Sequence, residues 1–567
     1  MSNTQHPIRV NHRGFLTSGS KRFVLVDNKS GEEDFSIIHI LCDEKPVVYH
    51  GRMTRRTDEE GKDIWIGDFS DFTENGDYRL VAGGYTSRAF VIYDKAYDIC
   101  ARMMVEYFTY QRCGSDLGWN GCCHLDDGYI FETGEHVDLT GGYHQSCDLR
   151  KSPAGTAIGV LGMMRYAVKD TSEWGKRLLS DETAWACDYF VKTIQANGAM
   201  YNTLNEPFGW DGRVLFRSPA PSSAQWCATT ILAMGYRFFE ISQPERANRY
   251  LRTALRSYSY MTGNNRSVDV YRHPAHCPRG MDQDYFYAQC YKNSGADYAY
   301  QAMAAAELYR ATADEEYLTN LKLAAEQFSE CMLDGDLAFC AVWDQDHPRF
   351  VGASGTYAWL PAGIMSLCDA MELLDSHSNL EKLIRKAADG LCRLAEQSPW
   401  RRIPTVLADA DLDGLTGHPK PGENALTIRS QISALRKIGC GTVHGKTLAG
   451  YVNADGKKFV ASSACFYGAF LARAGKMLGE KRYLTYAQSV LDQLLGGDRL
   501  DSSKVQGIGY NHIPFGVFGQ FFPSTPFIPG AVGTPYDSID AVKSGSSEYD
   551  MPCVGMALTL LAELCYE

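Results

Sequence analysis

Residues 141–151 read Gly-Gly-Tyr-His-Gln-Ser-Cys-Asp-Leu-Arg-Lys, and Ser152-Pro153 follow directly. Two glycines allow a tight turn and a close approach of the backbone to a ligand. Ser followed by Pro is typical of a helix start. The stretch therefore predicts a glycine-led loop that carries one carboxylate, Asp148, just ahead of a helix. On its own such an Asp indicates only a helix cap, because carboxylates near helix N-termini are common.

A second acid lies near the far end of the chain, in residues 544–550, which read Ser-Gly-Ser-Ser-Glu-Tyr-Asp and precede an apolar helical pattern. Alone, Glu548 would be another capping residue. Two loop carboxylates ahead of separate helices are, however, what glycoside hydrolysis requires. One protonated acid gives its proton to the departing oxygen, and one carboxylate either activates a water molecule or attacks the sugar carbon.

At these two loops the sequence resembles glycoside hydrolase family 9, the endoglucanase family with a small immunoglobulin-like module before its catalytic barrel. The first loop of that family usually reads Gly-Gly-Trp-Tyr-Asp-Ala-Gly-Asp, and its second Asp is the general base. The late loop usually reads Asn-Glu before a helix, and this Glu is the general acid. The resemblance implies that Asp148 is the general base and Glu548 the general acid.

Further motifs extend the resemblance over nearly the whole chain. Val10-Asn11-His12-Arg13-Gly14-Phe15 resembles the start of the family's N-terminal module. The stretches 110–114, 122–124 and 529–533 resemble sequence motifs that the family carries between its two modules and before the general acid. Together these motifs are specific, although each alone is weak.

The residue pattern predicts two domains. Between residue 8 and about residue 93, six short apolar runs separated by turn signals such as Asn75-Gly76 indicate a β-sandwich. After Asp94 the apolar spacing becomes helical to the end of the chain, as at Cys187, Phe190, Val191 and Ile194.

Roughly a dozen helices are compatible with either a solenoid or a barrel. The resemblance selects the barrel. We therefore expect an immunoglobulin-like all-β sandwich over residues 1–93 and an all-α (α/α)6 barrel over residues 94–567.

The implied mechanism inverts the anomeric carbon. Asp148 would take a proton from the attacking water while Glu548, with a raised pKa, protonates the leaving oxygen. Many family members carry a second Asp in the first loop, and this chain has Gln145 there. An amide can hold the water by a hydrogen bond but cannot deprotonate it. Asp148 is then the only base candidate in the loop, which weakens the transfer of cellulase activity.

A second departure lies before the acid, where family cellulases have a His-Arg sequence that binds sugar. This chain has Asn511-His512 in the stretch 507–514, and both are candidate sugar ligands or else structural residues. The departures resemble the exo-β-D-glucosaminidase branch of the family, which removes glucosamine from the non-reducing end of short chitosan oligosaccharides. The alternatives are a β-1,4-glucanase or cellodextrinase acting on cello-oligosaccharides, and a non-catalytic sugar-binding relative.

Aromatic and acidic residues near the two loops are candidates for contact with the substrate. Tyr143, where the family has Trp, is the first candidate for a sugar platform, ahead of Trp210, Trp226, Tyr357 and Trp359. A glucosamine ammonium would need a nearby carboxylate. The candidates for that contact are Asp550, Asp138 and Asp284, each of which is also open to a purely structural role.

The composition limits the setting. A chain of 567 residues with 45% hydrophobic content predicts a globular protein of two domains. Eighteen cysteines, scattered without a CxxC pair, indicate reduced thiols. No signal-like segment and no long apolar run occurs, so we expect a cytoplasmic protein without a membrane contact.

A net charge of -12 argues against nucleic acid as a partner and is compatible with a cationic or neutral substrate. The resemblance implies that this substrate is an oligosaccharide. The sequence does not predict the oligomeric state.

No metal or cofactor is predicted, and the proposed hydrolysis requires none. Asp409 to Gly414 begins like a calcium loop, but its twelfth position is Lys420, which favours a solvated turn. His273, His276 and Cys277 have the spacing of zinc ligands without a clear fourth partner.

Overall fold

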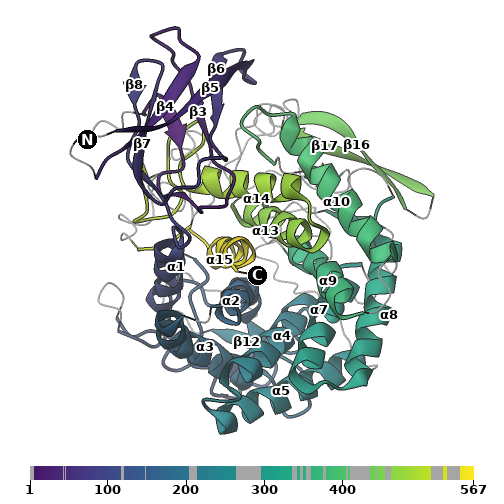
Figure 1. Ribbon diagram of the computed structural model, residues 1–567. Coiled ribbons are helices and arrows are strands. Elements are labelled where there is room, and N and C mark those ends of the chain that lie inside the picture. Colours follow the sequence, from purple (N-terminus) through teal and green to yellow (C-terminus); the bar gives the residue numbers. More distant parts are fainter. Residues whose placement is uncertain are drawn as a thin grey trace, which may run out of the picture.

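The fold was analysed in a computed structural model of the chain. The structure describes residues 5–566 with the exception of residues 42–43, 45, 117–120, 147–148, 171, 204–213, 264–294, 335–340, 345–348, 353–358, 375–377, 404–405, 409–434, 444, 454–460, 513–527 and 533–548. A β-sandwich lies against one side of a ring of helices (Figure 1).

The N-terminal sandwich confirms the predicted strands. Its strands are β1 (Ile8–Val10), β2 (Gly14–Phe15), β3 (Arg22–Leu25), β4 (Asp34–His39), β5 (Val47–Thr57), β6 (Asp63–Asp68), β7 (Gly76–Ala82), β8 (Tyr85–Thr86) and β9 (Phe90–Ile92). They are hydrogen-bonded in the order β1-β3-β6-β5-β4-β7-β9-β2, and β8 pairs with β7. Alternate residues of β7, such as Tyr78 and Leu80, are buried, whereas Arg79 between them is exposed. This period of two is expected of a strand with one face on the core.

The strand β5 belongs to both layers of the sandwich. Its first half, from Val47 to Arg52, pairs with β4, and its second half, from Met53 to Thr57, pairs with β6. The inner faces enclose an aromatic core in which the ring of Phe23 contacts those of Phe35 and Phe69. Such aromatic pairs add to the stability that burial supplies.

Twelve helices follow in the described part of the chain. They are α1 (Asp98–Tyr110), α2 (Pro153–Ala167), α3 (Glu173–Thr193), α4 (Ser222–Phe239), α5 (Pro244–Thr262), α7 (Gly295–Thr312), α8 (Glu315–Cys331), α9 (Trp359–Leu373), α10 (Ser378–Glu396), α13 (Ala461–Leu478), α14 (Lys481–Leu494) and α15 (Met551–Cys565). Every residue of α2 is buried, and so are all but the last two of α15. A helix that is buried on all sides belongs inside the domain.

The inner helices close into a ring. Each of α2, α4, α7, α9 and α13 contacts the next, and α15 contacts both α13 and α2. The outer helices α1, α3, α5, α8, α10 and α14 surround them (Figure 1). Because α5 buries only one face, it covers the ring as an amphipathic helix. The predicted (α/α)6 barrel is therefore observed.

One expectation for this domain was wrong, because the chain after Asp94 is not helical throughout. The structure adds the strands β10 (Tyr129–Ile130), β11 (Asn202–Thr203), β12 (Leu215–Arg217), β13 (Ala341–Asp344), β14 (Arg349–Gly352), β15 (Val406–Ala408), β16 (Leu435–Val443) and β17 (Lys446–Asn453). They form three small sheets. Their runs are short and lie between long helices, so helical periodicity dominated the sequence pattern.

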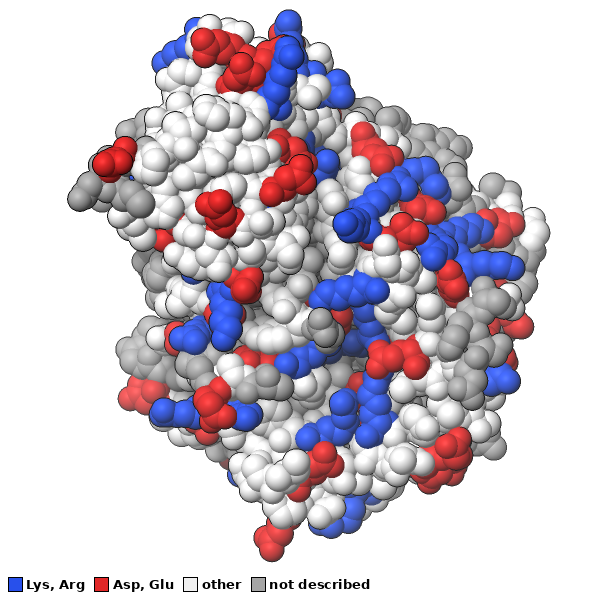
Figure 2. Space-filling model, viewed as in Figure 1, with Lys and Arg blue, Asp and Glu red and all other residues white. Residues whose placement is uncertain are grey.

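An ion-pair network closes one end of the barrel, where α2, α7, α9 and α13 end. The carboxylate of Asp369 on α9 accepts Arg473 at 2.8 Å and Arg310 at 3.2 Å, with Arg165 at 3.7 Å. Burial alone would raise the pKa of Asp369, but these three guanidinium groups hold it well below its usual value. Figure 2 shows charged side chains of both signs gathered across this end. Cations there also complement the negative ends of the helix dipoles.

Candidate active site

The base segment, which we define as residues 141–151, forms a tight hairpin at the start of α2. His144 and Lys151 face each other in a β-bridge, and Gln145 N donates to Arg150 O at 2.8 Å. Leu149 N donates to Ser146 O at 3.3 Å. The base candidate Asp148 stands between these last two residues in the sequence, and it lies outside the described residues together with Cys147.

Glycine is required at the foot of this hairpin. Gly142 has φ +74°, and a Cβ built on it would lie 2.6 Å from the Tyr189 ring. The predicted tight turn is thus confirmed, but the close neighbour of the glycine is an aromatic side chain of the protein.

Buried polar contacts hold the hairpin on the barrel. Lys151 is fully buried, and its Nζ donates to Asp127 Oδ2 and to Leu139 O, both at 2.7 Å. Trp185 Nε1 donates to Gly142 O at 3.0 Å. A buried ammonium requires such partners, so these contacts fix the hairpin in position.

Tyr143 corrects a prediction, because the structure places it in the core. The side chain is 1% exposed, and its ring makes a T-shaped contact with that of Phe108 at a centroid distance of 5.9 Å. Its hydroxyl donates to Glu182 Oε2 at 3.1 Å. No face of the ring is open for a sugar to stack on. Neighbouring residues in a hairpin point to opposite sides, and the loop sequence did not reveal which side faces inward.

The predicted helix start after the hairpin is confirmed. Ser152 Oγ accepts a hydrogen bond from Gly155 N at 3.1 Å, and Pro153 is the first residue of α2. Gln145 is only 8% exposed and lies against this first turn. A Cβ on Gly155 would come within 2.0 Å of Gln145 Oε1, so the glycine makes room for the amide.

The acid segment, which we define as residues 548–551, meets the base segment. Ser146 and Asp550 form a β-bridge, and Met551 N donates to Gln145 O at 2.9 Å. Asp550 is 4% exposed, and its backbone N donates to Val532 O at 3.3 Å. The acid candidate Glu548 lies outside the described residues.

The packing of two helices explains why the base and acid segments lie against each other. The inner helices α2 and α15 approach so closely that a Cβ on Gly162 would lie 2.0 Å from Gly555 O. A Cβ on Gly159 would lie 2.6 Å from Met551 O. Glycines at the crossing allow backbone contact between the two helices. The loops that precede them therefore end side by side.

The other predicted substrate contacts are distributed over the molecule. Asn511 Nδ2 donates to Asp501 Oδ2 at 2.9 Å, and His512 Nδ1 lies 3.3 Å from Ser503 O. Asp138 is exposed and pairs with Lys192 at 3.0 Å. The prediction that Trp226 is a weaker candidate for a sugar platform was wrong, because its side chain is fully buried. Four more candidates lie outside the described residues or have an undescribed side chain: Trp210, Asp284, Tyr357 and Trp359.

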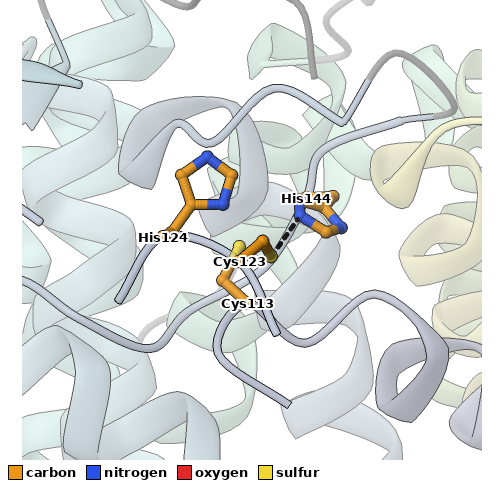
Figure 3. A group of neighbouring side chains, drawn as sticks. All are labelled: Cys113, Cys123, His124 and His144. Atoms are coloured by element: carbon orange, nitrogen blue, oxygen red, sulfur yellow. Dashed lines mark hydrogen bonds between the residues drawn. The ribbon is translucent and has the colours of Figure 1, made fainter. Parts of the chain in front are cut away.

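The structure also assembles four metal-ligating side chains beside the base segment, from Cys113, Cys123, His124 and His144 (Figure 3). One ligand atom from each residue lies within 4.8 Å of the others, and all four residues are buried. Cys123 Sγ lies 3.2 Å from His144 Nε2. We call these residues the Cys2His2 group.

The donor set of the Cys2His2 group fits zinc. Two sulfurs and two imidazoles are the ligands of a closed tetrahedral structural site. A hydrogen bond from Cys113, followed by contacts with His124 and His144, holds the pKa of the Cys123 thiol well below its usual value, which favours the thiolate that binds metal. Both ring nitrogens of His124 are buried, and neither has a hydrogen-bond partner among the residues that the structure describes. A zinc ion here would fix the base segment through His144 and leave no open position for catalysis.

Sequence reasoning missed this group. In the sequence, the stretches 110–114 and 122–124 indicated only a family resemblance, and His144 was only one residue of the first loop. Their spacing matches no short ligand motif, so only the folded chain brings them together. The two metal alternatives that the sequence raised, at residues 273–277 and 409–414, lie outside the described residues.

Comparisons with known proteins agree with the architecture. The profile of glycosyl hydrolase family 9 matches residues 97–515, and that of the cellulase N-terminal ig-like domain matches residues 3–87. A cellodextrinase of Butyrivibrio fibrisolvens is 26% identical over 358 residues, which are 57% of this chain and 62% of that protein. Endoglucanase D of Acetivibrio thermocellus is 26% identical over 359 residues, which are 57% of this chain and 54% of that protein.

This chain therefore spans between half and two thirds of the length of these relatives. Among solved structures, a metagenome-derived glycoside hydrolase family 9 endoglucanase superposes with a TM-score of 0.68 at 17% identity, and 99% of each chain is covered. This likeness shows the fold. Within the described residues, none of the helices combines the length and the apolar character that a membrane span would need.

Proposed function

The chain belongs to glycosyl hydrolase family 9, and on that premise we propose that it hydrolyses β-1,4-linked glucan oligosaccharides with inversion at the anomeric carbon. Asp148 is the general base of this proposal, and Glu548 is the general acid.

One observation carries the proposal: the base and acid segments lie against each other. Ser146 and Asp550 form a β-bridge that joins the two segments. Ser146 lies two residues before Asp148, and Asp550 lies two residues after Glu548. Consecutive Cα atoms are about 3.8 Å apart, so chain geometry keeps both acids within a short reach of this bridge. Two carboxyl groups brought to one place from separate loops suit acid and base work on one glycosidic bond.

In the proposed step, water attacks the anomeric carbon and the bond from that carbon to the leaving oxygen breaks. Asp148 takes the proton from the water, and Glu548 gives its proton to the leaving oxygen. Inversion requires about 6.5–9.5 Å between the two carboxyl groups, which leaves room for the water. Gln145 supports the hairpin that carries the base. Asn511, His512 and Asp550 remain proposed substrate contacts.

The choice of substrate follows the relatives. The proteins compared above are named cellodextrinase and endoglucanase, which favours glucan oligosaccharides over chitosan oligosaccharides. A second candidate, exo-β-D-glucosaminidase activity, is favoured by Gln145 in place of an acid and by Asn511-His512 in place of His-Arg. We keep it as the rival that an assay must exclude.

Two variants test the assignment of the acids. Asp148→Asn and Glu548→Gln should each lower turnover of cellotriose by about 10²–10⁴-fold, because each removes one proton transfer. Glu135→Gln, an exposed carboxylate outside both segments, should leave turnover unchanged. Normal turnover by either of the first two variants would refute the assigned roles.

One comparison decides the substrate. Purified protein is incubated with equal concentrations of cellotriose and of its glucosamine counterpart, and released monosaccharide and disaccharide are quantified. Faster cleavage of cellotriose supports the proposal, whereas faster release of glucosamine establishes the rival. Binding of both without cleavage would indicate a non-catalytic sugar-binding protein.

A further inference from the structure

A cleft of about 500 Å³ opens between the sandwich and the barrel. Its sandwich wall consists of His6, Arg79 and residues 86–89, and its barrel wall consists of Tyr510 and Asn511. We call it the junction cleft. In Figure 1 the segment that follows α14 runs beside β7 at the lower edge of the sandwich. The volume lies within the range of small-molecule sites, about 300–1,000 Å³.

The walls of the junction cleft are cationic. Arginines 79 and 88 line it, and no Asp or Glu is among its lining residues. The exposed guanidinium of Arg79 pairs with no carboxylate in the described part of the chain. A cationic hollow is unusual for a protein with a net charge of -12. It attracts anions, because a hollow lined by one sign of charge focuses the field.

A buried carboxylate lies beneath the cleft, beside two arginines. The buried carboxylate of Asp501 lies 3.0 Å from Arg88 Nη2 and 3.7 Å from Arg9 Nη1. It also accepts His12 Nε2 at 2.9 Å, and burial first of all lowers the pKa of this histidine, so His12 adds little positive charge. Arg9 and Arg88 therefore both lie beside the carboxylate of Asp501, whereas Arg79 pairs with no carboxylate among the described residues.

An aromatic ring completes the barrel wall. Tyr510 is 46% exposed, which is high for so large a side chain. The Arg88 guanidinium lies 4.4 Å from the centroid of its ring, and the His12 ring makes a T-shaped contact with it at a centroid distance of 5.3 Å. These contacts hold the ring in place before any ligand arrives. An ordered exposed aromatic ring can contact the apolar face of a sugar, and the neighbouring guanidinium can bind an anion.

We propose that the junction cleft binds a small anionic saccharide, such as a sugar phosphate or a sugar carboxylate. Arg79 binds the anionic group, and Tyr510 contacts the sugar ring. The chemistry is that of a charge-assisted hydrogen bond combined with a stacking surface. The site shares no residue with the base or acid segments, although its barrel wall includes Asn511, one of the proposed contacts of the glucan substrate.

Because the cleft lies between the two domains, ligand binding affects how they are held together. One wall belongs to the sandwich and the other to the barrel, so a ligand that contacts both binds only while the two domains stay docked. Such a ligand stabilises the folded state in proportion to the logarithm of its concentration over its dissociation constant.

Titration calorimetry of the full-length protein tests the proposal, with glucose 6-phosphate and glucuronate as probes and with glucose and inorganic phosphate as comparisons. We expect saturable binding of at least one anionic sugar with a dissociation constant below about 1 mM. Glucose and phosphate should bind at least about tenfold more weakly, since each offers half of the recognised chemistry. The midpoint of thermal unfolding should rise with the anionic sugar.

Variants locate the site. Arg79→Ala and Tyr510→Ala should each weaken binding about tenfold or more, because loss of a charge-assisted contact costs that much. Arg56→Ala removes an exposed arginine elsewhere on the sandwich and should bind like the parent. Glu548→Gln should also bind normally, which separates this cleft from the catalytic centre. The proposal is overturned if no anionic sugar binds, if phosphate alone binds as tightly, or if Arg79→Ala leaves affinity unchanged.

Discussion

At the scale of single residues, the sequence supplied the chemical groups but not their surroundings. Asp148 and Glu548 were selected because each acid follows small residues and precedes a helix, which is a local pattern. Tyr143 was misassigned because burial depends on Phe108 and Glu182, which are distant in the sequence. Residue type is local information, whereas exposure depends on the whole fold.

Asp492, on α14, gives a prediction for the pH dependence of stability. Burial raises the pKa of this carboxyl to about 7, against the opposing hydrogen bonds from Asn11 and Gln488. The folded state therefore holds a proton that the unfolded state loses near pH 4, and stability falls as pH rises toward 7. Asp492→Asn keeps an acceptor for both amides and should remove this fall.

The free energy of unfolding of parent and Asp492→Asn protein is measured between pH 4 and pH 8. We expect the free energy of unfolding of the variant, relative to that of the parent, to increase by about 2–4 kcal/mol between pH 4 and pH 8. A constant difference between the two proteins across this range would show that the carboxyl does not titrate as described.

The Cys2His2 group gives a prediction for metal. Cys123→Ser should abolish stoichiometric zinc, measured by elemental analysis of the purified protein, and should lower the midpoint of thermal unfolding. Turnover should fall as well, because His144 belongs to the hairpin that carries Asp148. Cys122→Ser is the matched control, since the neighbouring thiol is exposed and outside the group. Equal zinc content in both variants would exclude these ligands.

At the scale of secondary structure, the sequence was most informative where periodicity was long. The spacing of Val554, Ala557, Leu558 and Leu561 predicted the last helix, and all four residues are buried in α15. Hairpins such as β16 and β17 were missed, because short apolar runs are ambiguous between helix and strand. No pattern indicated that α2 and α15 cross at glycines, since a glycine within a helix has several explanations.

That crossing can be tested by filling it. Gly162→Ala introduces a Cβ 2.0 Å from Gly555 O, so the two helices must separate. We expect a loss of about 1–3 kcal/mol of unfolding free energy and a lower turnover number, because the base and acid segments move apart. Gly121→Ala is the control, since a Cβ there meets no atom within 4 Å. Unchanged stability in Gly162→Ala would show that the contact is not tight.

At the scale of the whole molecule, the two ends of the barrel differ in character. One end carries the loops before α2 and α15, and the other is closed by buried ion pairs around Asp369. The sequence predicted the barrel only through resemblance, because a dozen amphipathic segments do not distinguish a closed ring from a solenoid. It gave no sign of the network, whose partners come from four separate helices.

The network should be essential for barrel stability. Asp369→Ala leaves Arg165, Arg310 and Arg473 without their shared carboxylate in the interior, which should cost about 3–5 kcal/mol of unfolding free energy. Asp389→Ala removes a half-exposed partner of Arg482 and should cost less than about 1 kcal/mol. Chemical denaturation of both variants measures the difference. Similar losses in the two variants would contradict the structural role given to Asp369.

The proposed hydrolysis depends on two acids from distant loops that act across one glycosidic bond with a water molecule between them. Proton NMR of the first product released from cellotriose tests this directly, because it reports the anomer before mutarotation. We predict that the α-anomer appears first, as inversion of a β-linkage requires. First appearance of the β-anomer would place the acids too close together for a water molecule and would contradict the account.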